Sequence, residues 1–286
     1  MKALENKVGI LPELENKSAE IQQRNNTIWT TTLAFECFGV KIGILATAGL
    51  LLDELRALLP PSSNELKEGP VDKFFKLIIS ETESILYEND FEKLRFPGNK
   101  WVSEALRGQL KSCVSQFTAE RVFIHAGVVA HQDRLILIPG EGFSGKTTLT
   151  AELVKAGAIY YSDDFAILDQ NALVYPYPKP LSLRQKGANT GEQTDYDVGH
   201  FGGVQGINPL PVSLVVITEY QARARWRPQT LTPGEGVLEI LRHTNNSLRQ
   251  PQFAVEVLQK VVIQAKIIKS KRGEAEKAAR AILQEC

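Results

Sequence analysis

The chain has 286 residues, of which 43% are hydrophobic and 23% charged, so it can build a substantial core and is not disordered throughout. Its 33 basic and 33 acidic residues balance, and a neutral chain lacks the broad basic face that nucleic-acid binding requires. The three cysteines are far apart in the sequence, which excludes a disulfide framework and a cysteine-cluster metal site and suits a reducing cytosol.

Residues 1–26 are polar and weakly patterned, and we expect them to form a flexible N-terminal arm. Their content of Glu, Lys and Asn is unlike that of a signal peptide. The apolar stretch at 42–52 has about 11 residues, far fewer than the roughly 20 that cross a bilayer. We therefore expect a cytoplasmic protein with no membrane partner.

The next region, 27–118, has the pattern of a small α+β extension. Alternating apolar residues predict a β-hairpin over 31–38 and 40–45, and helical periodicity predicts a helix over 49–59 that ends at two prolines. Strands are predicted at 74–80, 84–87 and 91–96. A helical apolar stripe over 99–117 completes the region.

The remaining residues, 119–286, predict a larger α/β domain. Strands are expected at 122–130, 135–138, 158–161, 165–168, 172–174, 212–217 and 225–231, and helices at 146–155, 235–242, 253–265 and 273–284. Residues 185–209 contain six glycines and few aliphatic side chains. We expect a long loop there, which either closes over a substrate or is disordered.

The strongest motif lies between the strand at 135–138 and the helix at 146–155. It fits the P-loop pattern G-x-x-x-x-G-K-[ST], in which glycines let several N–H groups point at one phosphate. The lysine supplies a cation for the terminal phosphates, and the threonine offers a hydroxyl to magnesium. The expected nucleotide-binding residues are Gly140, Glu141, Gly142, Phe143, Ser144, Gly145, Lys146, Thr147 and Thr148.

Two adjacent carboxylates, Asp163 and Asp164, follow the next predicted strand. A right-handed crossover would place this strand parallel to the strand at 135–138 and near it, with their carboxyl ends at one edge. The pair would then lie beside the phosphates, with roles in metal binding and as a general base. The alternative is that one aspartate only begins a turn.

His125 lies in the strand before the P-loop strand. A histidine in an apolar strand can be an ordinary core residue. It reaches the P-loop only if the two strands are staggered, which the sequence leaves open.

The stretch 123–164 resembles the catalytic domain of bacterial HPr kinase/phosphorylase, which has a histidine, a strand pair, a P-loop, a helix and an Asp-Asp pair in this order. The resemblance implies a mixed β-sheet core with a P-loop, of the phosphoenolpyruvate carboxykinase-like type. It also implies that His125 is the active-site histidine, that Lys146 and Thr147 bind phosphate and Mg²⁺, and that Asp164 takes the proton from a substrate serine.

Two positions depart from that family. Ala126 follows the histidine where the family has glycine, and Ser182 stands where the family has a metal-binding glutamate. Arg184 matches the family's arginine and is a candidate for binding substrate or phosphate. The N-terminal 119 residues do not resemble the family's usual N-terminal domain.

These observations lead to two hypotheses. The first is an ATP-dependent, Mg²⁺-requiring kinase that transfers the γ-phosphoryl group to a serine hydroxyl of a small protein, peptide or free amino acid, with a homo-oligomer left open. Asp163 and Thr147 would hold the metal, and His125, Lys146 and Asp164 would carry the chemistry. The alternative is a nucleotide-binding regulatory module that recruits a partner without catalysis.

Overall fold

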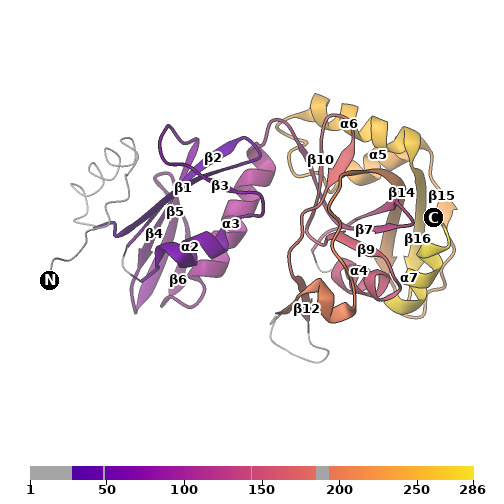
Figure 1. Cartoon of the computed structure of the whole chain (residues 1–286), viewed down its shortest axis with the longest axis horizontal. Helices are drawn as coiled ribbons and strands as arrows, with labels where there is room; N and C mark the ends of the chain where they lie inside the picture. The colour runs from indigo at the N-terminus through magenta and orange to yellow at the C-terminus, as the bar shows by residue number, and fades with distance from the viewer. Residues whose placement is uncertain (1–27, 48, 143, 185–192) are drawn as a thin grey trace. The chain divides into compact units, whose positions relative to one another are not determined.

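The computed structural model describes residues 28–47, 49–142, 144–184 and 193–286, and it divides the chain into two compact units, Met1–Ala119 and Glu120–Cys286 (Figure 1). The division falls next to the boundary expected from the sequence at residue 118. The arm expected at 1–26 lies outside the described residues. Among the helices that are described, none combines the length and apolar character needed to span a membrane.

The described residues of the N-terminal unit form a six-stranded sheet in the order β3-β1-β2-β4-β5-β6 and two helices. Its elements are β1 (Thr31–Cys37), β2 (Val40–Ala46), α2 (Leu52–Leu58), β3 (Asn64–Glu65), β4 (Lys73–Ile79), β5 (Glu83–Glu88), β6 (Phe91–Pro97) and α3 (Val102–Phe117). Strands β2 and β4 are parallel, and the segment with α2 connects them, as a parallel pair requires.

The predicted elements of this unit are confirmed, and β3 is the addition. The β1–β2 hairpin turns at Phe38 and Gly39, both with positive φ, which suits the two-residue turns that join twisted strands. The two residues of β3 pair with β1 and lie in the segment between α2 and β4.

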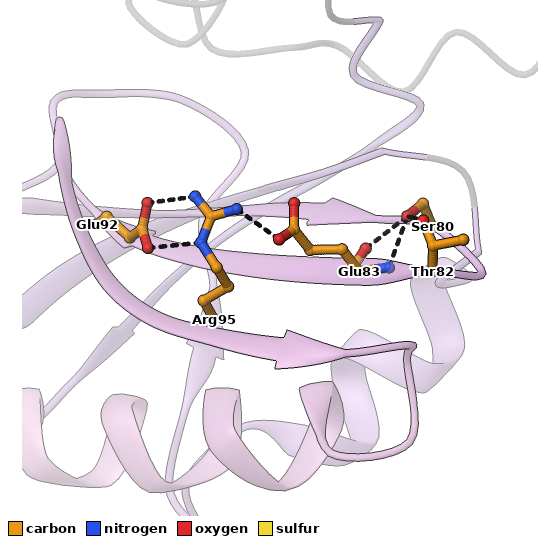
Figure 2. Close-up of polar contacts among 5 residues, drawn as sticks. All are labelled: Ser80, Thr82, Glu83, Glu92 and Arg95. Atoms are coloured by element: carbon orange, nitrogen blue, oxygen red, sulfur yellow. Dashed lines mark hydrogen bonds and ion pairs between the residues drawn. The ribbon is translucent and has the colours of Figure 1, made fainter.

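Strand β6 forms one edge of this sheet and is covered by charged side chains. Figure 2 shows the guanidinium of Arg95 between the carboxylates of Glu83 and Glu92. Its nitrogens lie 2.6 Å from a Glu83 oxygen and 2.7 Å from a Glu92 oxygen. In the turn between β4 and β5, the Ser80 hydroxyl donates to the Glu83 carbonyl at 2.6 Å and lies 3.4 Å from the Thr82 hydroxyl. Charges on an edge strand discourage pairing with another chain.

The C-terminal unit is built on an eight-stranded mixed sheet in the order β11-β10-β7-β8-β14-β16-β15, with β9 also paired to β7. The strands are β7 (Val122–His131), β8 (Arg134–Pro139), β9 (Ile159–Ser162), β10 (Phe165–Leu168), β11 (Leu173–Tyr175), β14 (Leu210–Tyr220), β15 (Gln229–Thr230) and β16 (Lys266–Arg272). The helices are α4 (Lys146–Lys155), α5 (Pro233–Leu241), α6 (Pro251–Gln264) and α7 (Ala275–Leu283).

Helices cover both faces of this sheet, which is the arrangement of an α/β protein (Figure 1). One hydrophobic cluster joins the even-numbered residues of β7 to α5 and α6, and a second joins Val129 of β7 to α4 and α7. The odd-numbered residues of β7, which share a face because strand side chains alternate, therefore point toward α4.

The P-loop lies at the carboxyl end of three neighbouring parallel strands. β8 pairs with β14 and β14 with β16, all in the same direction, so their carboxyl ends lie at one edge of the sheet. The P-loop follows β8 at this edge. Ligands in open α/β sheets bind at such an edge.

Three sequence expectations for this unit need correction. The strand predicted over 225–231 is reduced to β15, and β16 was not predicted at all. Of the loop expected at 185–209, residues 185–192 lie outside the described residues, but the rest is partly regular: β13 (Gln193–Tyr196) pairs with β12 (Leu181–Arg184), and a 3₁₀ helix, η1, spans Val198–Phe201. Beyond it, Gly206 donates to the Tyr160 carbonyl at 2.7 Å, so this segment runs beside β9.

Candidate active site

The P-loop residues form a tight turn between β8 and α4. β8 ends at Pro139, and α4 begins at Lys146 directly after Gly145, whose φ of 81° lies in the left-handed region that favours glycine. A Cβ on Gly140 would lie 3.0 Å from the Ser144 hydroxyl oxygen, so the loop folds closely on itself. Phe143 lies outside the described residues.

Lys146 is a buried lysine, with 8% of its surface exposed. Its Nζ donates to the Glu141 carbonyl at 2.6 Å, which bends the side chain back over the loop. Burial lowers the pKa of Lys146, and the negative charges of Asp163 and Asp164 act against this. The next two residues of α4, Thr147 and Thr148, are half-buried and exposed respectively.

The two aspartates lie at a break between β9 and β10, and both of these strands pair with β7. β9 runs in the same direction as β8, as expected, but β7 separates the two strands. The position is still close to the P-loop, because Ala126 of β7 pairs with Pro139 and also donates from its N–H to the Asp164 carbonyl at 3.2 Å.

Asp163 is buried against the first turns of α4, with 6% of its surface exposed. Burial raises its pKa to about 6, although a hydrogen bond with the Thr147 side chain and the nearby Lys179 and Lys146 lower it. Its Oδ1 has no hydrogen-bond partner. A buried carboxylate oxygen of this kind is costly, and such groups gather at functional sites.

A glycine in β7 makes room for these groups. A Cβ on Gly127 would lie 2.5 Å from the Thr150 hydroxyl oxygen and 3.9 Å from Oδ1 of Asp163. Only glycine therefore fits at this position while α4 and the aspartate stay where they are.

His125 lies beside the beginning of the P-loop. Its carbonyl accepts from Gly140 N–H at 3.1 Å, so the antiparallel pairing of β7 with β8 continues one residue beyond the Ala126–Pro139 pair. The two strands need no stagger for this, because the regular register of the hairpin places His125 opposite Gly140. His125 belongs to the face of β7 that points toward α4, and its ring lies 6.0 Å from the ring of Phe165, the residue after Asp164.

Three charged or titratable side chains near the loop were missed by the sequence analysis. Lys179 Nζ lies 3.5 Å from Oδ2 of Asp164. His243 accepts through its carbonyl from His125 N–H at 2.7 Å, and burial lowers the pKa of its ring. Arg272, at the end of β16, donates from Nη2 to the Gly145 carbonyl at 2.9 Å. None of the three belongs to a local motif, because long-range strand pairing and a loop bring them to the P-loop.

The Ser182 side chain contacts a carboxylate on the neighbouring strand. Ser182 lies on β12, and its hydroxyl donates to the Asp195 side chain of β13 at 2.5 Å. Arg184 is the last residue of β12 and pairs with Gln193 through the backbone, while its side chain lies outside the described part of the chain.

The donor set of the site fits a magnesium ion that is bound together with a nucleotide. Within the described residues, no group of three or more His, Cys, Asp or Glu side chains is placed to hold a metal. Mg²⁺ differs from metals held by an all-protein cage, since it commonly keeps waters and takes one or two carboxylates with substrate phosphates. The Thr147 hydroxyl and the unpartnered Oδ1 of Asp163 are oxygen donors of the right kind.

Comparison with known proteins shows a distant structural likeness. No family model matches the chain, and no curated protein sequence matches it. Among solved structures, the chain is similar to the Hpr(Ser) kinase/phosphatase from Coxiella burnetii, with 15% sequence identity and a TM-score of 0.28, over 57% of this chain and 99% of that one. The mixed α/β architecture is evident from the structure itself, and the proposals below rest on the geometry of the site.

Proposed function

We propose that this protein is a kinase that uses ATP and Mg²⁺ to phosphorylate a hydroxyl group, such as the serine of a small protein, a peptide or the free amino acid. The observation that carries the proposal is the position of a buried pair of acids beside the P-loop. Asp163 forms a hydrogen bond with the Thr147 side chain at the start of α4, and the Asp164 carbonyl accepts from Ala126 N–H in β7. The residues Lys146, Asp163 and Asp164 are each less than a tenth exposed.

The P-loop supports the nucleotide half of the proposal. The N-terminus of α4 carries partial positive charge, and the ammonium of Lys146 adds a full one at the same place. Both suit the β- and γ-phosphates of a nucleotide. Lys146 donates to the Glu141 carbonyl in the structure, and we expect it to exchange this partner for phosphate oxygens.

Asp164 supports the transfer half. It follows Asp163 directly, and its carboxylate lies at the same end of the sheet as the loop, so it can accept the proton of an acceptor hydroxyl as that oxygen attacks phosphorus. Asp163 and Thr147 are the proposed metal ligands, and Mg²⁺ bound there would supply charge neutralisation for the phosphates. His125, beside Gly140, is proposed to orient the groups around the terminal phosphate.

The test compares the wild-type protein with Asp164→Asn. The protein is incubated with labelled ATP, Mg²⁺ and a panel of acceptors that includes free serine and serine peptides. We expect Asp164→Asn to bind ADP as the wild type does and to transfer phosphate about 10²–10⁴-fold more slowly, because general-base catalysis is lost.

Asp169→Asn is the matched control. Asp169 is also buried, but its carboxylate accepts from the N–H groups of Asn171 and Leu173 in the β10–β11 turn, away from the P-loop. The Asp169→Asn variant should transfer phosphate at the wild-type rate per folded molecule. If Asp164→Asn transferred phosphate at the wild-type rate, its role as the base would be wrong. If the wild type bound nucleotide stably and labelled no acceptor, the regulatory module would be favoured.

A further inference from the structure

A second lysine, Lys179, is fixed in place beside the acidic pair by its own segment of chain. It lies between β11 and β12 in the run Tyr177-Pro178-Lys179-Pro180, where each proline restricts the backbone. The buried hydroxyl of Tyr160 donates to the Lys179 carbonyl at 2.9 Å. The Tyr177 N–H donates to the Tyr161 carbonyl at 3.0 Å, so the segment is tied to β9 at two points.

The side chain of Lys179 combines an ion pair with access to a ligand. Its Nζ lies 3.5 Å from Oδ2 of Asp164, and 26% of the side chain is exposed. Lys146, the other lysine beside the acidic pair, is buried, and its ammonium bends back toward the Glu141 carbonyl. The positive charge of Lys179 also acts on Lys146 and on Asp163, which shows that all four side chains form one charge cluster.

The two lysines approach this cluster from different parts of the chain. Lys146 belongs to the loop that would hold the nucleotide, whereas Lys179 contacts the carboxylate that would receive the acceptor's proton. A phosphoryl group that moves from the nucleotide to the acceptor would therefore leave the first ammonium and approach the second.

Building on the proposed function, we propose that Lys179 is a catalytic residue of phosphoryl transfer that holds the Asp164 carboxylate before the reaction and binds the phosphoryl oxygens as the group reaches the acceptor. The acceptor oxygen forms a bond to the γ-phosphorus, and the bond from that phosphorus to the β,γ-bridging oxygen breaks. The electron pair of the broken bond stays on ADP, and the hydroxyl proton goes to Asp164.

This step explains why a cation belongs beside the base. Once Asp164 is protonated it is neutral, and its attraction for the Lys179 ammonium falls. The phosphoryl group carries negative oxygens into the same space at that moment, so Lys179 exchanges one anionic partner for another. A cation that is already in position costs no reorganisation when the charge arrives.

The experiment measures binding of ADP alone and of ADP with Mg²⁺ and fluoroaluminate, a mimic of the transferring phosphoryl group. It uses the full chain as wild type, Lys179→Met, Lys179→Gln and Lys179→Arg, with titration calorimetry as the readout. We expect the uncharged variants to bind ADP within about 2-fold of the wild type and ADP–fluoroaluminate about 10²-fold more weakly, because a stabilising donor is lost from the transition-state mimic only. Lys179→Arg should regain at least about 10-fold, since it restores the charge.

Lys266→Met is the matched control. Lys266 also forms an ion pair, 2.6 Å from Glu285, but it begins β16, at the opposite end of that strand from the P-loop. The Lys266→Met variant should bind ADP and ADP–fluoroaluminate as the wild type does. Where the wild type turns over ATP, kcat should fall about 10²–10³-fold in Lys179→Met while KM for ATP changes little, a split that a general packing defect would not give.

The outcomes separate this inference from the proposed function. If the wild type binds ADP–fluoroaluminate more tightly than ADP and Lys179→Met does so equally well, Lys179 has no role and the kinase proposal stands. If both uncharged variants lose ADP itself, or arginine restores nothing, the role is structural and the inference is wrong. If the wild type does not bind ADP, or fluoroaluminate does not tighten binding, both proposals fail.

Discussion

Each of the two compact units buries a lysine, and the surroundings of the two side chains differ. In the N-terminal unit, Lys76 is 5% exposed and its Nζ reaches Asp90, 2.7 Å away, whose side chain is 81% exposed. In the C-terminal unit, Lys146 donates to a carbonyl of its own loop and faces two buried acids. The alkyl chain of Lys76 is buried while its ammonium pairs with a carboxylate at the surface. The ammonium of Lys146 instead stays inside its unit.

The same contrast holds for buried polar atoms that have no partner. Around the P-loop, these include the hydroxyls of Ser144 and Thr150, Oδ1 of Asp163 and Nε of Arg272. Unpartnered buried groups destabilise a fold, and proteins keep them mainly where a ligand can satisfy them. Such atoms are therefore concentrated where the ligand site is proposed, whereas the described residues of the N-terminal unit hold two, Nε1 of Trp29 and the Ser84 hydroxyl.

The largest difference between the units should come from replacing the two lysines. We expect Lys146→Met to reduce ATP turnover by about 10²–10³-fold, because a preorganised cation is removed from the phosphates. Lys76→Met should leave turnover and ADP affinity unchanged and alter only thermal stability. Titration calorimetry and labelled-ATP assays on both variants test this. Equal effects of the two substitutions on ADP affinity would remove the basis of the comparison.

A second expected effect concerns the stability cost of Asp163. Its pKa is raised from 3.8 to about 6 by burial, which corresponds to about 3 kcal/mol. As pH rises from about 4 to 6, the Asp163 carboxyl loses its proton readily in the unfolded chain but not in the folded protein. The folded state therefore loses stability over that range, and the full cost remains at higher pH. Asp163→Asn should therefore be more stable than the wild type near pH 7 without nucleotide or Mg²⁺.

Urea unfolding at several pH values measures this difference. The gap between Asp163→Asn and the wild type should close as the pH falls toward 4, where both states are protonated. The same variant should bind ADP with Mg²⁺ more weakly, since a proposed metal ligand is gone. A variant that was less stable than the wild type at pH 7 would contradict the cost assigned to this carboxylate.

A smaller effect is expected from Arg272, which contacts the P-loop from β16. Arg272 is 3% exposed, and its Nη2 donates to the carbonyl of Gly145, the residue with left-handed conformation directly before α4. Arg272→Met should weaken ADP binding about 10-fold, the size expected for one hydrogen bond from a charged group. Arg280→Met removes an exposed pair with Glu276 on α7 and should leave ADP binding unchanged, which calorimetry can check.

The elements with regular apolar periodicity were predictable from the sequence, and the long-range pairings were not. The helix at 146–155 has the predicted bounds because a glycine precedes it and Gly157 follows it. β16 was missed because its only apolar residues are Ile267 and Ile268. The later inward positions, Ser270 and Arg272, are buried but polar. A pattern of buried polar residues gives no strand signal.

The candidate site divides in the same way. Lys146, Thr147 and the aspartates come from local motifs, so the sequence could name them. The sequence could not show that β7 lies between β8, which leads to the P-loop, and β9, which leads to the aspartates. The order of strands in a sheet depends on pairings between distant segments. Lys179 was missed for a related reason, since its contact with Asp164 depends on how the chain returns past β9 after the β10–β11 hairpin.

The smallest expected effect lies on the edge strand of the N-terminal sheet. Arg95 forms short contacts with Glu83 and Glu92, yet all three side chains are more than 40% exposed. Water competes for such ion pairs, so Arg95→Gln should change the free energy of unfolding very little. ADP affinity should not change. Urea unfolding at low and high salt measures the effect, which should shrink as salt screens the charges. A large loss of stability would show that the N-terminal unit also depends on its charge network, and the contrast between the units would no longer hold.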